Sequence, residues 1–178
     1  VPSGILEMRV SREQMAENRL RILQEADRLF REKGFEAVTV AEVMKAAGLT
    51  HGGFYGHFES KDDLFAQTLM HGLTQVAPPV GSWSDYLGHY LASGRCADKA
   101  SGCTIADLAC EATRQTAEAR AAMTEGIRLQ LDRLGQMLSE GDPAERRRAA
   151  IGSWAAMVGA VILSRACDDN QLAEEIVQ

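Results

Sequence analysis

The sequence has few of the features that mark secreted or membrane-spanning proteins. Its longest apolar stretch, Ile151 to Leu163, is too short to cross a bilayer and predicts a buried helix. The opening residues, VPSGILEMRV, contain no apolar run or cleavage pattern, so we expect no secretory signal. The chain does not start with methionine, and Met8 is an alternative native start that would leave out Val1 to Glu7. The composition, 46% hydrophobic and 25% charged, is ordinary for a globular protein.

Cysteine is sparse, and the sequence holds no recognisable set of catalytic residues. The four cysteines are not spaced as metal ligands, and a chain of 178 residues does not need disulfides, which favours a reducing cytoplasm. We find no nucleophile elbow, phosphate-binding loop or metal-ligand spacing, so we expect neither an enzyme nor a bound metal or cofactor. Cys96, Cys103 and Cys110 recur every seven residues. Two helical turns separate Cys103 from Cys110 by about 10 Å, too far for a direct disulfide. We expect them to be buried apolar side chains, with a thiol-based sensor as the alternative.

The net charge of −6 is unevenly distributed. Residues 1–60 carry eight Lys and Arg against nine Asp and Glu, a balance of −1, whereas residues 61–178 carry 11 against 16, a balance of −5. Because salt screens surface fields beyond about 10 Å, an acidic protein still binds DNA if a local patch is positive. The charges therefore permit DNA binding without arguing for it. The candidate patch consists of Arg9, Arg12, Arg19, Arg21, Lys45 and Lys61.

No segment shows sustained period-2 alternation, so we predict an all-α fold of about nine helices. The first helix is expected to begin after a cap at Ser11 and to end at Lys33, before Gly34. A late helix begins at Asp142-Pro143, which combine an N-cap with a first-turn proline. The predicted helices span residues 12–33, 40–47, 51–57, 61–76, 83–93, 103–115, 117–139, 143–167 and 170–177.

Residues 39–63, TVAEVMKAAGLTHGGFYGHFESKDD, carry the most specific pattern in the chain. Gly48 lies between two short helical segments, where it supplies a left-handed turn residue that a side chain would strain. Two short helices joined by a tight glycine turn form a helix-turn-helix, whose second helix enters the DNA major groove. The expected helix starts are Thr39 with Glu42, Thr50, and Ser60 with Asp63.

A longer set of matches extends this pattern over residues 19–65. In order, these are Ile-Leu, Leu-Phe, Gly-Phe, Thr-Val, Ala-Gly-Leu-Thr, Phe-Tyr, His-Phe and Ser-Lys-Asp. The region resembles the N-terminal domain of the TetR (tetracycline repressor-like) family of transcriptional regulators. Residues 83–178 resemble one TetR subgroup more loosely, through GCTIADLACE and ILSRACDDNQLAEEIV.

The resemblance implies two domains and a function. Residues 1–60 would form a three-helix DNA-binding domain with the helix-turn-helix, and residues 61–178 a helical ligand-binding and dimerisation domain. The protein would be a sequence-specific regulator, commonly a repressor, that a small-molecule effector releases from double-stranded operator DNA. Such a protein works in the cytoplasm as a homodimer and has no membrane partner. A redox-sensing regulator is the alternative.

The resemblance also implies which residues contact phosphates. Thr39 and Thr50 would supply hydroxyl and helix-terminus contacts. Tyr55 and His57 would contact phosphates on the two sides of the groove, and Lys61 would pair with a further phosphate.

The base-reading positions follow less clearly. His51 stands where many relatives have Lys or Arg and is the candidate base contact. Gly52 and Gly53 leave little side chain to reach base edges, and each glycine costs about 1 kcal/mol of helix propensity. That cost indicates either close approach of DNA to the backbone or a tight packing position. A ligand-binding protein without DNA recognition therefore stays open as an alternative.

The predicted helix 143–167 is apolar nearly all round, which implies burial on several sides. Small residues at i, i+3, i+4 and i+7 allow a second helix to approach closely. We therefore expect a two-fold dimer with a four-helix interface, and a monomeric bundle as the alternative. The expected interface residues are Gly152, Trp154, Ala155, Ala156, Gly159 and Ile162.

The remaining helices are expected to enclose an apolar cavity, as in the TetR family. The sequence pattern does not separate cavity-lining residues from ordinary core residues. The effector is expected to be small and mostly apolar, with Tyr86 or Tyr90 as its hydrogen-bond partner. The candidate lining residues are Leu69, Leu73, Trp83, Tyr86, Tyr90, Ile105, Leu108, Met123 and Ile127.

Overall fold

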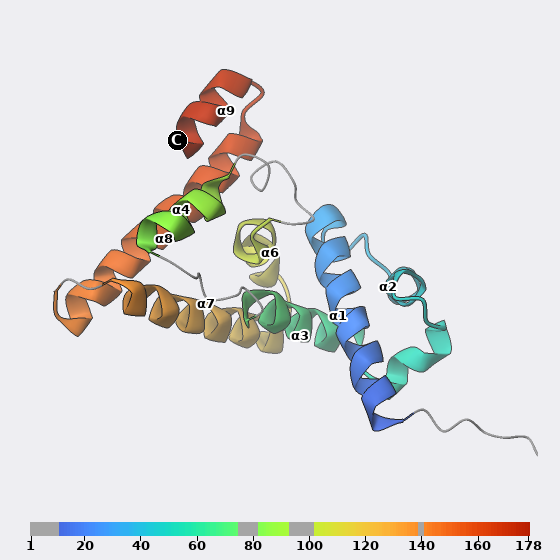
Figure 1. Ribbon diagram of the computed structural model, residues 1–178. Coiled ribbons are helices and arrows are strands. Elements are labelled where there is room, and N and C mark those ends of the chain that lie inside the picture. The colour runs from blue at the N-terminus through green and yellow to red at the C-terminus, as the bar shows by residue number, and fades with distance from the viewer. Residues whose placement is uncertain (1–10, 75–81, 93–101, 139–140) are drawn as a thin grey trace, which may run out of the picture.

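A computed structural model describes residues 11–74, 82–92, 102–138 and 141–178 (Figure 1). Within these ranges every regular element is a helix, eight of them α-helices and one a 3-10 helix, which confirms the all-α prediction. The elements are α1 Arg12–Lys33, α2 Val40–Ala46, η1 His51–Gly56, α3 Lys61–Thr74, α4 Trp83–Leu91, α6 Thr104–Ala112, α7 Ala117–Met137, α8 Pro143–Ala166 and α9 Asn170–Val177.

The helix starts follow the expected capping chemistry. The Ser11 hydroxyl accepts a hydrogen bond from the Gln14 amide at 3.1 Å, and Thr39 caps α2 through the Glu42 amide at 3.2 Å. At α8 the Asp142 carboxylate accepts the Glu145 amide at 2.9 Å. Each bond satisfies an amide that has no partner within its own helix, so these boundaries are set locally.

The second helix of the helix-turn-helix differs from the prediction. It is a 3-10 helix, held by bonds such as Gly53 N–H to Thr50 O at 3.0 Å. Thr50 stands at its N-cap but makes no side-chain capping bond, so the expected cap is wrong. Three of the six residues are glycine, which lowers the helix propensity, and short helical pieces commonly take the tighter 3-10 form. Gly48 has a φ of 70° and makes the expected left-handed turn.

The ends of several helices also differ. The helix predicted over 103–115 is α6, which ends at Ala112 and has Cys103 as its N-cap. The predicted ends at residues 76, 93 and 139 lie outside the described residues, where α3, α4 and α7 are described only to Thr74, Leu91 and Met137.

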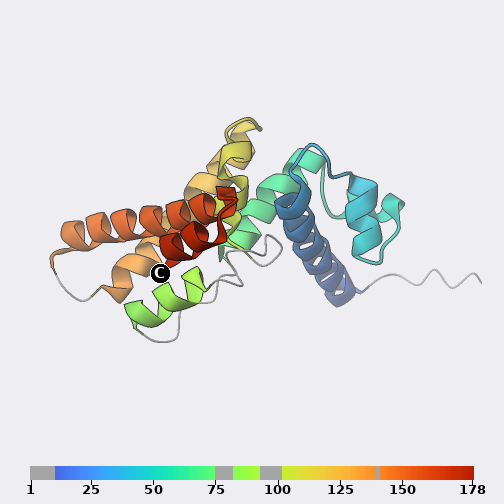
Figure 2. The same cartoon turned by 90° about the horizontal axis from the view of Figure 1, so that it is seen from above.

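The helix α3 joins the two parts of the fold. It packs against α1 on one side and most extensively against α7 on the other. Figure 2 shows α1, α2 and η1 at one end of the molecule and α8 with α9 at the opposite end. At the α3 and α7 contact, a Cβ on Gly126 would lie 2.8 Å from the Leu73 Cβ, so only glycine permits this close approach.

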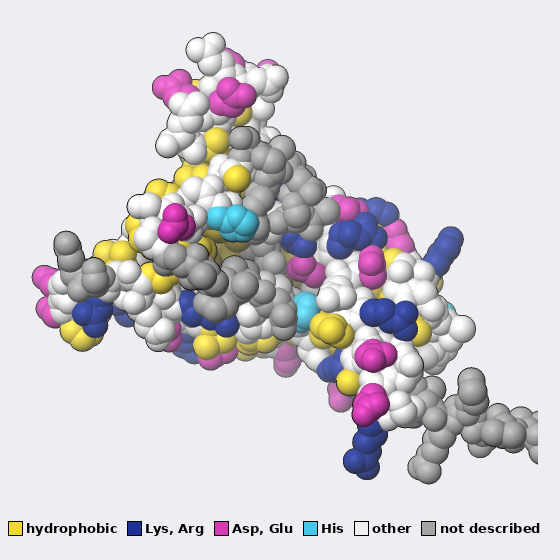
Figure 3. Space-filling model, in the orientation of Figure 1, with side chains coloured by type: hydrophobic (Ala, Val, Ile, Leu, Met, Phe, Trp, Pro, Cys, Tyr) yellow, Lys and Arg dark blue, Asp and Glu magenta, His cyan; other side chains and the backbone are white. Residues whose placement is uncertain are grey.

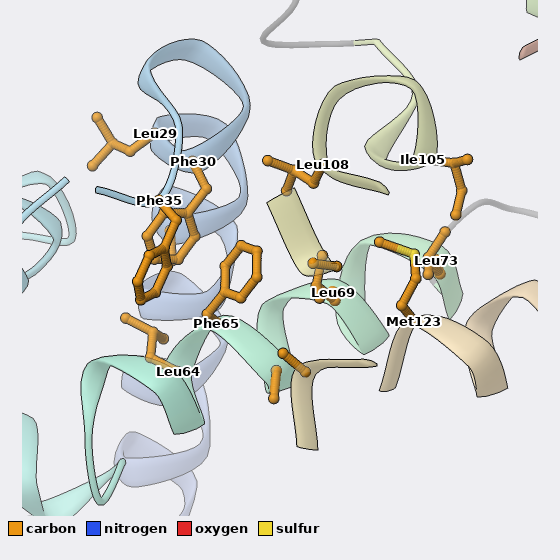
Figure 4. Close-up of a cluster of buried hydrophobic side chains, with 14 of the residues drawn as sticks. Leu29, Phe30, Phe35, Leu64, Phe65, Leu69, Leu73, Ile105, Leu108 and Met123 are labelled. Carbon is orange, nitrogen blue, oxygen red and sulfur yellow. The ribbon is translucent and has the colours of Figure 1, made fainter. Parts of the chain in front are cut away.

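One hydrophobic core runs through the chain from α1 to α8. Its aromatic part, seen in Figure 4, joins the N-terminal helices to α3. The Phe65 ring of α3 lies edge-on to Phe30, with centroids 5.1 Å apart, and 4.9 Å from the Phe35 ring. Such aromatic pairs stabilise beyond their buried area, so the helix-turn-helix is held rigidly against α3.

Candidate nucleic-acid interface

Most of the predicted contact residues of the helix-turn-helix are exposed. Thr39 at the start of α2, and Thr50, His51 and Gly52 at the start of η1, are all exposed. Tyr55 is 71% exposed, the largest fraction among the exposed large hydrophobic side chains, and its ring lies edge-on to buried Phe54 at 5.3 Å. A tyrosine held on a core aromatic while its hydroxyl faces water is suited to contact a hydrogen-bonding partner.

His57 lies just beyond η1 and is half-buried. Burial, and then the neighbouring Arg19 guanidinium, lower the pKa of His57 below its ordinary value. The imidazole is therefore neutral at pH 7. In that state it donates a hydrogen bond to a phosphate but adds no positive charge.

Arg19 serves the fold rather than the charged patch. Its guanidinium donates to the His57 carbonyl and to the Gln67 side-chain oxygen. It also lies over the Phe58 ring, with its central carbon 4.4 Å from the ring centroid. The prediction that it contributes to a DNA-facing patch is wrong, since its donors are used to tie α1 to η1 and α3. Arg9, another member of that patch, lies outside the described residues.

Lys61, the first residue of α3, has contacts within the protein. Its ammonium nitrogen lies 4.2 Å from the Phe35 ring centroid and 3.5 Å from the Glu36 carbonyl oxygen. The cation–π contact orients the side chain. Asp63 shares the same helix start: its amide donates to the Ser60 hydroxyl at 3.0 Å, as the capping prediction required.

A hollow of about 360 Å³ lies beside η1, between this helix, α1 and the end of α2. The glycines of η1 form one side of the hollow, and methionine and leucine side chains contribute apolar surface to the rest. It is lined by Met15, Asn18, Met44, Leu49, Thr50, Gly52, Gly53, Gly56 and His57.

Comparison with known proteins identifies this region. The family model described as "Bacterial regulatory proteins, tetR family" matches residues 22–68. Over 59 residues the chain is 41% identical to the HTH-type transcriptional regulator AcrR of Shigella flexneri, a match that covers 33% of this chain and 27% of AcrR. Residues 22–68 therefore have the sequence of a TetR-family helix-turn-helix region. The match spans only about a quarter of the length of AcrR, so it concerns the helix-turn-helix region.

The fold similarity extends over nearly the whole chain. The reduced form of E. coli NemR superposes with a TM-score of 0.70 at 20% identity, covering 90% of this chain and 93% of NemR. A transcriptional regulator from Saccharomonospora viridis, solved in complex with choline, gives 0.67 at 16% identity and covers 92% and 93%. The C-terminal helices of this chain therefore share the fold of those regulators.

The predicted ligand-contacting residues lie mostly in or against the hydrophobic core. Leu69, Leu73, Ile105, Leu108 and Met123 belong to the hydrophobic core, where Figure 4 shows their side chains turned toward one another. Buried Tyr86 and half-buried Trp83 and Tyr90 form a row on α4, with successive ring centroids 5.9 and 6.0 Å apart. Ile127, on α7, is half-buried.

Two buried polar contacts among the C-terminal helices were not predicted from the sequence. The Gln130 amide donates to the Tyr86 hydroxyl at 2.9 Å, joining α7 to α4. Asp107 of α6 forms an ion pair with Arg165 of α8, and their side chains are only 5% and 13% exposed. The partners are 44 and 58 residues apart, so no local signal in the sequence indicates either contact.

The outer surface of α8 remains apolar. Gly152, Ala155 and Ala156 are exposed and Gly159 is half-buried, while Ile162 is 45% exposed. In Figure 3 hydrophobic side chains follow α8 along one edge of the molecule. Trp154 is 7% exposed and packs in the core of its own chain, so its assignment to a surface that meets another subunit is wrong.

By length and composition alone, α8 would also be long and apolar enough to cross a membrane. The same helix has four arginines, Arg146, Arg147, Arg148 and Arg165, toward its two ends. Its exposed apolar residues alternate with buried ones such as Met157. That arrangement fits a helix covered by protein on two sides.

The cysteines do not behave as expected. Cys110 on α6 is exposed and Cys103 is half-buried, so the prediction of buried apolar roles is wrong for Cys110. Cys96 lies outside the described residues. Among the residues that the structure describes, no group of three His, Cys, Asp or Glu side chains is placed to hold a metal ion.

Proposed function

We propose that this protein is a homodimeric transcriptional repressor that binds operator DNA and is released by a small, mostly apolar effector. The helix-turn-helix carries the proposal: Thr39, Thr50, His51 and Tyr55 are each exposed on a module whose sequence matches TetR-family regulators. We assign DNA binding to residues 1–60 and effector binding with dimerisation to residues 61–178. A regulator of this kind acts in the cytoplasm.

The direct test is selection of DNA by the purified protein. We expect the wild-type chain to enrich a two-fold symmetric sequence from a randomised duplex pool about 30 bp long, because a dimer contacts two half-sites about one helical turn apart. Recovery of no preferred sequence would reject the proposal.

Replacing Tyr55 with Phe tests the phosphate assignment. The change removes only an exposed hydroxyl, so thermal stability should stay unchanged. We expect affinity to fall about tenfold for both the selected operator and random duplex, the size of a lost bond to a charged group. Fluorescence anisotropy with the two duplexes measures both. A loss confined to one base-pair variant of the operator would assign Tyr55 to a base instead.

The dimer proposal rests on the exposed apolar surface of α8 and α9. Ile162 and Leu163 of α8 are 45% and 57% exposed, and Leu172 of α9 is 45% exposed. A monomer rarely leaves such residues gathered in water, whereas a two-fold contact between copies of α8 and α9 covers them.

An Ile162→Glu variant should therefore sediment as a monomer. Burying an unpaired carboxylate costs several kcal/mol, so the dimer Kd should rise at least about 100-fold. The matched control is Leu20→Glu, which replaces a side chain of similar exposure, 43%, on α1. Analytical ultracentrifugation measures the dimer Kd of both variants. Equal Kd values for the two variants would place the dimer contact elsewhere.

For effector binding, the candidate is the aromatic row of Trp83, Tyr86 and Tyr90 on α4, in which the Tyr86 hydroxyl accepts a hydrogen bond from Gln130. The similar regulator from Saccharomonospora viridis was solved with choline, which supports a ligand role for this helical part. The exposed thiol of Cys110 and the half-buried thiol of Cys103 favour redox sensing as a second candidate. If peroxide releases the wild type from DNA, loss of this release in Cys103→Ser or Cys110→Ser would favour the second candidate.

A further inference from the structure

Gln130 is a polar residue on the buried side of α7, where it is only 5% exposed. Burial removes the water that would otherwise bond its amide, so both ends of the amide need partners inside the protein. The other buried residues of this helix are small or apolar: Ala119, Met123, Gly126, Leu131 and Leu134.

The two ends of the Gln130 amide are treated differently. The Nε2 group donates a hydrogen bond to the Tyr86 hydroxyl at 2.9 Å, which orients the side chain toward α4. The Oε1 atom is buried and has no hydrogen-bond partner among the residues that the structure describes. A buried acceptor that lacks a donor is destabilising, so the folded protein gains nothing from this oxygen.

An apolar residue at position 130 would serve the fold about as well. Leucine or methionine has a similar volume and would leave no acceptor unpaired, and it would forgo only the bond to Tyr86. A polar group at a core position that does not require one is typical of a functional site. The oxygen is therefore suited to a donor from outside the chain.

The side chains beside Gln130 determine which ligand suits this oxygen. Tyr86 is the middle ring of the aromatic row on α4, with Trp83 and Tyr90 on either side, and these two outer rings are half-buried. Flat aromatic faces favour a planar apolar ligand. Neither the rings nor the amide carries a charge, so an ionised ligand would lose its hydration without gaining a counterion.

We propose that Gln130 is a specificity-determining residue of the effector site, where its Oε1 atom accepts a hydrogen bond from a neutral, planar ligand that carries an O–H or N–H group. This assignment rests on the proposed function, in which the helical part of the chain binds the effector. It adds one requirement to a mostly apolar effector: a hydrogen-bond donor.

The test uses pairs of probes that differ only in the donor. These are 2-naphthol with 2-methoxynaphthalene, and indole with 1-methylindole. Isothermal titration calorimetry on the protein without DNA measures the four affinities. We expect wild type to bind the donor-bearing member of at least one pair about tenfold more tightly than its methylated partner, the value of one buried hydrogen bond.

Gln130→Leu and Gln130→Met should bind both members of that pair with equal affinity, because neither replacement offers the carbonyl oxygen. The matched control is Gln136→Leu, which removes an exposed glutamine from the same helix and should keep the tenfold preference. Both residue-130 variants should melt within about 4 °C of wild type, since the lost bond to Tyr86 is offset by removal of the unpaired acceptor.

A preference that is lost in both residue-130 variants and kept in Gln136→Leu supports the assignment. A preference that survives in the residue-130 variants overturns it, as does a wild type that binds neither probe of either pair or binds both members equally. Failure of both residue-130 variants to fold also overturns it, because the amide would then serve the fold. Operator selection is measured separately, so none of these results decides whether the protein binds DNA.

Discussion

Raising the salt concentration from about 50 to about 200 mM is expected to weaken operator binding by about a thousandfold or more. Each lysine or arginine that neutralises a phosphate releases counterions, and a dimer doubles the number of such contacts. Arg12, Arg21 and Lys45 are exposed on the N-terminal helices, and Lys61 starts α3.

Titration of labelled duplex at several salt concentrations gives the slope of log affinity against log salt. Lys45→Ala and Arg21→Ala should each make the slope shallower, whereas Arg147→Ala on α8 should leave it unchanged. An affinity that does not depend on salt would contradict a surface that binds phosphates. The net charge of −6 does not weaken this expectation, because screening limits the effect of the distant acidic half.

Asp107→Ala is expected to destabilise the protein by about 3–5 kcal/mol. The change removes the carboxylate with which Arg165 forms its ion pair, and the side chains of Arg165 and Asp107 are 13% and 5% exposed. The loss is large against the total stability of a typical domain, about 5–15 kcal/mol. It should also loosen α6 from α8, the two helices that the pair joins.

A second ion pair provides the control. Asp132 and Arg147 lie 2.6 Å apart between α7 and α8, but their side chains are 56% and 47% exposed. Asp132→Ala should cost less than about 1 kcal/mol because water and salt screen an exposed pair. Urea unfolding at one fixed protein concentration measures both variants, since dimerisation contributes to apparent stability. Equal losses would show that burial does not set the strength of these pairs.

The start of α2 and the turn that follows it could be predicted because their causes are local. Thr39 and Gly48 act through bonds and backbone angles within a few residues of themselves. The helix type of residues 51–56 was harder to predict from the sequence. A low helix propensity argues against a stable α-helix but does not indicate which conformation forms instead. The hydrophobic pattern of α8 does not say which of its sides faces its own chain, as Trp154 demonstrates, because a residue that packs in the core and one that stays exposed are equally apolar in the sequence.

The sequence by itself determined that this protein is all-α, where its helix-turn-helix lies, and which family it resembles, since caps, turns and periodicity act between near neighbours. Only the tertiary structure decided what its polar side chains do. Arg19 turns inward to His57 and Gln67, and Asp107 meets Arg165 across 58 residues. Burial likewise lowers the pKa of His57 below its ordinary value. These outcomes depend on which surfaces come together after folding, and the free energy of a charge or a hydrogen bond depends on that environment.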